Sequence, residues 1–213
     1  MTVDRRLMRR TVLFGTPFLY VVLGLIHPME DPRLGDATTV FIWLHFAQLF
    51  LIAGLAWSLW LLVEGLESRA ATVTRALIVP YAILYTALDS IAGLGMGSLV
   101  EIANGLPADE QAVAGQLVAE LDEPDVAGYA LWLGAGLSWF AAVLASTFAL
   151  RGLGPRWALV LMAVGALIFA VGHPKPPGPV GMSLFLAGVV WLELRPSRAE
   201  TRALPTTQPT MSS

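Results

Sequence analysis

No cysteine occurs in the sequence, and charged residues make up only 14% of it. The absence of cysteine excludes disulfides, thiolate metal ligands, cysteine-bound iron–sulfur clusters and cysteine nucleophiles. The share of charged residues is far below the value of about 25% that is typical of soluble domains. Hydrophobic residues make up 56% of the chain, so the composition predicts an integral membrane protein whose surroundings are a lipid bilayer.

The sequence also lacks the motifs that hold nucleotides or activate a serine. No glycine-rich loop leads into a Lys-Ser or Lys-Thr pair, and no Gly-x-Ser-x-Gly pattern occurs. The spacing Gly93-x-Gly-x-Gly97 falls within an apolar stretch rather than between a strand and a helix. The net charge of −3 gives no sign of a nucleic-acid partner, and we expect none.

Six apolar stretches give the expected architecture. They cover residues 11–27, 39–63, 77–104, 129–150, 157–173 and 180–194. A hydrocarbon core about 30 Å thick is crossed by about 20 residues of α-helix, so the fold class predicted is an all-α bundle of six transmembrane helices. We expect a single domain over residues 1–204 and a disordered cytoplasmic tail over residues 205–213, which are rich in Pro, Thr and Ser.

Two features refine this prediction. The first stretch follows four arginines, as a signal peptide would, but it ends in His-Pro-Met-Glu-Asp-Pro without a small-residue cleavage site, so we expect a retained helix that Pro17 kinks. The acidic loop before the fourth stretch carries Val113, Leu117, Val118 and Leu121 at helical spacing. This spacing predicts a short amphipathic helix at the membrane surface.

The distribution of basic residues predicts the orientation. Of 13 lysines and arginines, all but Arg33 and Lys175 flank the same side of a six-helix arrangement. The positive-inside rule then places both termini in the cytoplasm of a bacterial-type plasma membrane, with the acidic loops outside. Glu64, Glu67 and Glu193 are expected at headgroup level, with partners on the basic face.

One carboxylate, Asp89, interrupts the third apolar stretch. An acid at mid-bilayer depth costs about 2.5–3.5 kcal/mol on insertion scales, and such residues mark functional sites. From its position Asp89 lies in the outer half of the bilayer, at a depth similar to that of His45 in the second stretch. The chain has three histidines, and the other two, His27 and His173, close the first and fifth stretches on the outer side.

These residues define a candidate site. His45 and Asp89 are the candidate catalytic residues. Together with His27 and His173 they supply the nitrogen and oxygen donors that a divalent transition metal such as zinc accepts. The candidate ligand-binding residues are Tyr85, Gln48, Gly93, Gly97 and Glu101. The spacing Gly93-x-x-x-Gly97 is equally typical of a close helix crossing.

His45 and Asp89 resemble two zinc ligands of a superfamily of seven-span membrane hydrolases that includes alkaline ceramidases and the progestin and adiponectin receptors. The resemblance covers these two positions. The last stretch here has no histidine pair, and Tyr85 stands where that family has a serine. The resemblance implies that a zinc site with hydrolase-like activity is feasible in such a place, without assigning the chain to the family.

Three hypotheses about function follow from the residues. The first is a polar pocket that binds a metal ion or small polar ligand and has hydrolase-like activity. The second is a proton-linked transporter or channel subunit in which Asp89 titrates. The third is a structural or assembly subunit, in which Asp89 is a buried acid bonded to Tyr85, His45 or the backbone. Haem ligated by paired histidines is the least favoured chemistry.

Overall fold

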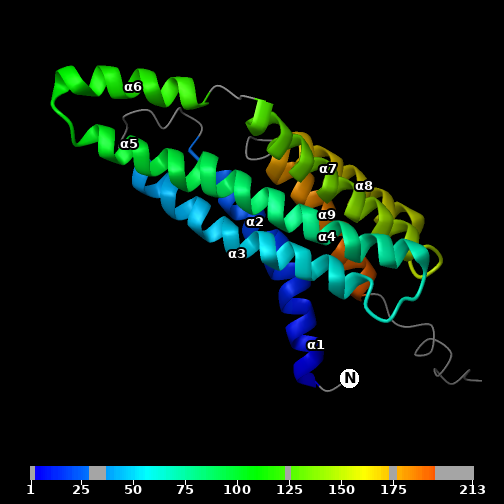
Figure 1. Cartoon of the computed structure of the whole chain (residues 1–213). Coiled ribbons are helices and arrows are strands. Elements are labelled where there is room, and N and C mark those ends of the chain that lie inside the picture. Colours follow the sequence, from blue (N-terminus) through cyan, green and yellow to red (C-terminus); the bar gives the residue numbers. More distant parts are fainter. Residues whose placement is uncertain (1–2, 29–36, 123–125, 173–176, 195–213) are drawn as a thin grey trace, which may run out of the picture.

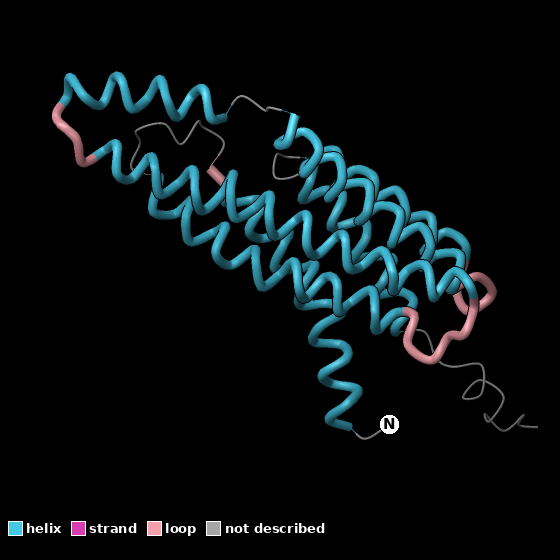
Figure 2. Tube along the Cα trace, in the orientation of Figure 1, coloured by secondary structure: helices cyan, strands magenta, loops and turns pink. Residues whose placement is uncertain are grey.

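In the computed structural model, residues 3–28, 37–122, 126–172 and 177–194 are described, and they fold into helices joined by short loops (Figures 1 and 2). These residues contain no strand. Five of their helices are long and apolar enough to cross a membrane. The described part of the chain is therefore all-helical, and several of its helices are apolar enough for the multi-pass membrane protein that the composition predicts. The expected tail of residues 205–213 lies outside the described residues.

The helices follow the predicted stretches, with some different boundaries. In chain order they are α1 (Val3–Arg10), η1 (Thr11–Gly15), α2 (Thr16–Ile26), α3 (Thr38–Leu62), α4 (Arg69–Leu88), η2 (Asp89–Gly95), α5 (Met96–Asn104), α6 (Ala108–Asp122), α7 (Val126–Ala149), α8 (Arg156–Gly172) and α9 (Pro177–Leu194). The elements η1 and η2 are π-helical segments within longer helices, so α1 to α2 and α4 to α5 are each continuous.

The first helix is irregular next to Pro17, where the sequence predicts a kink. Pro17 lies two residues after the end of η1, in the first turn of α2. Proline has no N–H to donate to the carbonyl four residues earlier, so regular α-helical bonding is interrupted at this point. The helix is π-helical rather than α-helical over Thr11–Gly15, just before this proline.

The third long helix begins at Arg69, eight residues before the predicted start at Leu77. Its N-terminus is capped by Ser68, whose hydroxyl accepts a hydrogen bond of 3.2 Å from the Ala71 amide. Arg75 remains inside the helix because its guanidinium donates to two loop carbonyls, those of Val63 at 2.7 Å and Leu66 at 2.9 Å. The predicted start is late because hydropathy excludes a stretch that contains an arginine, even where the backbone is helical.

The fifth predicted span, 157–173, corresponds to α8, a shorter apolar helix of 17 residues. It packs along α9 and α7, and Figure 1 shows these three helices side by side. The contact with α9 is close because Gly165 and Gly181 face each other: a Cβ on either would lie 2.5 to 2.6 Å from the other's carbonyl oxygen. Small residues that allow such an approach are typical of helix pairs in membranes.

Both ends of the described chain lie at one end of the bundle. Arg9 in α1 pairs with Glu193 in α9 at 3.1 Å, and it also donates to the Leu61 carbonyl at the end of α3. Arg5 pairs with Glu64 at 2.8 Å. These contacts confirm that Glu64 and Glu193 have partners among the basic residues.

Residues of the acidic loop form the helix α6, and its packing differs from a simple amphipathic arrangement. Figure 1 shows α6 running back along α5. Val118 is buried in a small cluster with Met96 and Val100 of α5. Val113 and Leu117 of the predicted apolar face are exposed. Of these three residues, Val118 therefore packs against α5.

An aromatic cluster fills the centre of the bundle. Trp139 of α7 packs against Tyr81, Phe169 and Phe185, with ring centroids 5.1 to 5.8 Å apart. Tyr85 stacks on Phe169 at 6.1 Å. Rings from α4, α7, α8 and α9 thus meet at one place. The cluster includes α4, the helix that continues into η2.

Candidate functional site

The site begins where the third long helix changes from α to π geometry. Asp89 is the first residue of η2, and its backbone amide bonds to the carbonyls of Tyr85 and Thr86. A π-helical turn adds a residue and so changes the direction in which following side chains leave the axis. Both Asp89 and Gly93 of this segment are buried, and η2 packs on α3.

His45 of α3 and Asp89 of η2 form a buried pair. The His45 Nε2 atom lies 3.9 Å from the Asp89 Oδ1 atom. Each residue is only 5% exposed. The distance is longer than a direct hydrogen bond, so the two groups are neighbours that a small movement or a bound ion would connect. The structure therefore brings together the two residues that sequence analysis selected as catalytic.

The tautomer of His45 follows from its second ring nitrogen. The Nδ1 atom lies 2.8 Å from the Phe41 carbonyl oxygen, one helical turn earlier. A carbonyl oxygen only accepts, so Nδ1 carries the hydrogen in the neutral ring. Consequently the lone pair of Nε2 faces Asp89.

His27 joins the pair from the end of α2. Its ring is edge-on to that of His45, with centroids 5.2 Å apart. Its Nδ1 atom is 3.0 Å from the Pro28 carbonyl oxygen, so Nε2 carries a lone pair here too. His27 follows the last residue of the first membrane-spanning helix, and burial lowers the pKa of its imidazole while the bond to Pro28 opposes that shift.

Phe41 is a contributor that sequence reasoning missed. Its ring contacts both imidazoles, with centroids 4.1 Å from His45 and 5.6 Å from His27. Its carbonyl fixes the His45 tautomer. The signal that could have identified it is its spacing, because a histidine in a helix reaches the carbonyl four residues earlier.

The two glycines proposed as ligand-binding residues are sites of close helix contact. A Cβ on Gly93 would overlap the imidazole of His45. A Cβ on Gly97 would meet Ile42 and Phe41. The space beside both glycines is thus occupied by side chains of α3. This is the arrangement that the spacing Gly93-x-x-x-Gly97 predicts for a crossing of two helices.

Several buried polar atoms in this region have no hydrogen-bond partner among the described residues. They are both amide atoms of Gln48, Oδ2 of Asp89, Nε2 of His27, the Tyr81 hydroxyl and Nε1 of Trp139. Buried polar groups are usually satisfied by protein, water or ions. Gln48, a candidate ligand-binding residue, is fully buried in α3. Of these atoms, Oδ2 of Asp89 and Nε2 of His27 belong to the candidate site.

The remaining candidates are Tyr85, Glu101 and His173. Tyr85 is buried, and its ring stacks within the aromatic cluster. Glu101 is exposed on α5, twelve residues beyond Asp89 and therefore about 18 Å along the helix. His173 lies outside the described residues. Within the described part of the chain, no group of three or more His, Asp or Glu residues is arranged to hold a metal ion.

Comparisons with known proteins add no assignment. No protein-family model matches the chain, and neither a curated protein nor a solved structure does so.

Proposed function

We propose that this chain is a proton-linked transport or channel protein of a bacterial-type plasma membrane, and that the His45 and Asp89 pair carries the proton. In this proposal α8 completes six membrane crossings and both termini face the cytoplasm. The observation that supports it best is the distance of 3.9 Å between Nε2 of His45 and Oδ1 of Asp89, both buried within apolar helices.

The chemistry of the pair suits a single proton. An unpaired charge is expensive inside a membrane, whereas a neutral imidazole beside a neutral carboxyl group is tolerated. A proton on the Asp89 carboxyl group can pass to the Nε2 lone pair of His45. The products are an aspartate anion and an imidazolium cation, whose opposite charges lie next to each other. The proton therefore has two alternative positions a few ångströms apart, as a relay requires.

The packing favours a proton over a larger substrate. Gly93 lies against the His45 ring so closely that a single added methyl group would overlap it. Hydrolysis at this pair would need room for both water and the bond to be cleaved. A proton needs no such room, so proton binding is preferred to the hydrolase hypothesis.

The experiment measures proton binding directly. Infrared difference spectra of the reconstituted protein, recorded through a pH titration, should contain the carbonyl band of a buried carboxylic acid. Asp89→Asn should remove this band, and it should abolish the charge movement that a pH jump produces on a supported membrane. Glu101→Gln is the matched control because it removes an exposed carboxylate from the same continuous helix. A band and current unchanged in Asp89→Asn would overturn the proposal.

A divalent transition metal such as zinc is the second candidate. The observation that favours it is that His27 and His45 both direct Nδ1 to a backbone carbonyl. Metal-binding histidines characteristically have this arrangement, which leaves Nε2 for the ion. The described residues hold no preformed set of three ligands, so this candidate requires His27, His45 and Asp89 to move together around the ion. Elemental analysis after incubation with zinc tests it: one ion per chain in the wild type and none in His45→Gln is the expected result, and no zinc in the wild type would exclude it.

A further inference from the structure

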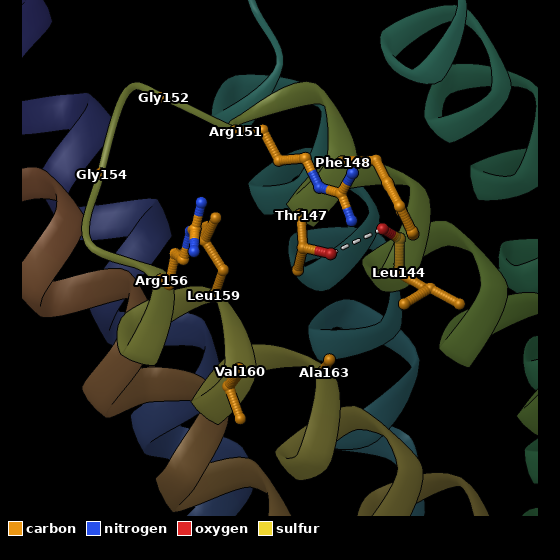
Figure 3. A pocket seen from close by; sticks show the side chains of 10 residues that line it. All are labelled: Leu144, Thr147, Phe148, Arg151, Gly152, Gly154, Arg156, Leu159, Val160 and Ala163. Carbon is orange, nitrogen blue, oxygen red and sulfur yellow. Dashed lines mark hydrogen bonds between the residues drawn. The ribbon is translucent and has the colours of Figure 1, made fainter.

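A second site lies at the opposite end of the bundle from His27, beneath the turn between α7 and α8. An open cavity of about 680 Å³ is present there. Figure 3 shows Arg151 and Arg156 at the turn, with Val160 and Ala163 farther along α8. Leu144 and Phe148 of α7 line the facing wall. The end of the cavity at the α7–α8 turn is therefore lined by cationic groups, and the rest of its wall is lined by apolar side chains.

The two arginines have uncompensated charge. Arg5 and Arg9 at the same end of the bundle pair with glutamates, whereas neither Arg151 nor Arg156 has an ion-pair partner among the described residues. The Arg151 guanidinium lies 4.0 Å from the centroid of the Phe148 ring. This cation–π contact holds it over the cavity wall and leaves its N–H groups available for an anion.

The apolar wall continues onto the outer surface of the bundle. Val160 is 57% exposed, and Val164 and Leu167 on the same helix are exposed as well. Trp157 packs against Trp191 with ring centroids 4.8 Å apart. Tryptophans at helix ends are typical of the membrane–water interface, so the two arginines stand at the level of lipid headgroups.

We propose that this cavity binds one anionic phospholipid. The phosphate lies between the guanidinium groups of Arg151 and Arg156, which match a phosphate through paired N–H donors. An acyl chain follows Val160 and Ala163 along α8. The opposite charges of headgroup and arginines, and the continuity of the apolar wall with the lipid-facing surface, identify a lipid as the occupant. This site is independent of the chemistry of His45 and Asp89.

The test measures lipid retention by native mass spectrometry of the full chain. We expect the wild type to retain phosphatidylglycerol in preference to phosphatidylcholine. Arg151→Gln/Arg156→Gln should weaken phosphatidylglycerol binding about tenfold or more, because each basic residue near a membrane surface contributes measurably to anionic-lipid binding. Ala163→Phe, which fills the cavity and keeps both charges, should also reduce retention.

The matched control is Arg6→Gln/Arg69→Gln. It removes two exposed arginines from the same end of the bundle, neither of which lines the cavity, and should leave retention unchanged. Equal loss in the two double variants would overturn the proposal, since bulk charge would then explain binding. Full retention in Ala163→Phe would overturn it too. Displacement of the lipid by millimolar inorganic phosphate would show a site for a free anion instead.

Discussion

Gly93 of η2 lies directly against the imidazole of His45, so that no side chain could be added there without moving the ring. The same contact sets the approach of α3 to the third long helix and, through it, the distance between His45 and Asp89. This relationship makes the backbone at Gly93 part of the candidate site.

Substituting Gly93 tests this relationship. Gly93→Ala should lower the thermal unfolding midpoint in detergent, because overpacking costs about 1–3 kcal/mol and exceeds the gain of about 1 kcal/mol from removing a helical glycine. Gly15→Ala is the control, since Gly15 also lies in a π-helical segment but has open space where its Cβ would be. Gly15→Ala should be neutral or stabilising. Equal midpoints for the wild type and Gly93→Ala would show that the ring moves freely.

A double-mutant cycle tests whether His45 and Asp89 interact. Asp89→Asn and His45→Gln should each lower the free energy of unfolding by about 0.5–3 kcal/mol, because each replaces one of two buried polar groups that lie 3.9 Å apart. The double variant should cost less than the sum of the two by about 0.5–3 kcal/mol.

The control cycle combines Asp89→Asn with Ser146→Ala. The Ser146 hydroxyl donates to the Val143 carbonyl within α7, and it shares no partner with Asp89. Additivity is expected in this cycle. Additivity in the His45 and Asp89 cycle as well would mean that the two side chains are near each other without coupling.

The fold and part of the site could be predicted from the sequence. Apolar stretches locate most helices because burial in lipid requires an uninterrupted run of apolar residues. His45 and Asp89 could be expected at similar depth, since depth follows from helical rise. The glycine spacing at Gly93 and Gly97 predicts the close crossing that the structure contains.

Other features could not be predicted, for physical reasons. The π-helical turn that begins at Asp89 has no compositional signature, yet it decides which way Asp89 and Gly93 face. The early start of the third helix is hidden because Arg75 makes its polar contacts with loop carbonyls. The role of Phe41 depends on a backbone carbonyl, which every residue type possesses.

Two arginines at the same end of the bundle should differ in their effect on stability. Arg9 and Glu193 have side chains only 20% and 16% exposed, and Arg9 also donates to the Leu61 carbonyl at 2.7 Å. Arg9→Gln should therefore cost about 1–3 kcal/mol of unfolding free energy. Arg5 is 59% exposed in its pair with Glu64, so Arg5→Gln should change stability by less than about 0.5 kcal/mol. If denaturant titrations show that Arg5→Gln is more destabilising than Arg9→Gln, the Arg9–Glu193 ion pair is not the stronger link between α1 and the rest of the bundle.

The last prediction concerns pH and His27. Burial lowers the pKa of the folded-state imidazole below the value of about 6.5 expected in the unfolded chain. Below that value the unfolded chain binds more protons than the folded one, so His27 makes the free energy of unfolding fall as the pH falls. At pH values well above 6.5 the imidazole is neutral in both states, so His27 no longer makes the free energy of unfolding depend on pH. Unfolding free energies measured from pH 8 to pH 5 should therefore decrease more steeply in the wild type than in His27→Gln, in which this group no longer titrates. Parallel curves for the two proteins would mean that His27 is protonated as easily in the fold as in the unfolded chain, and would contradict a neutral imidazole at this position.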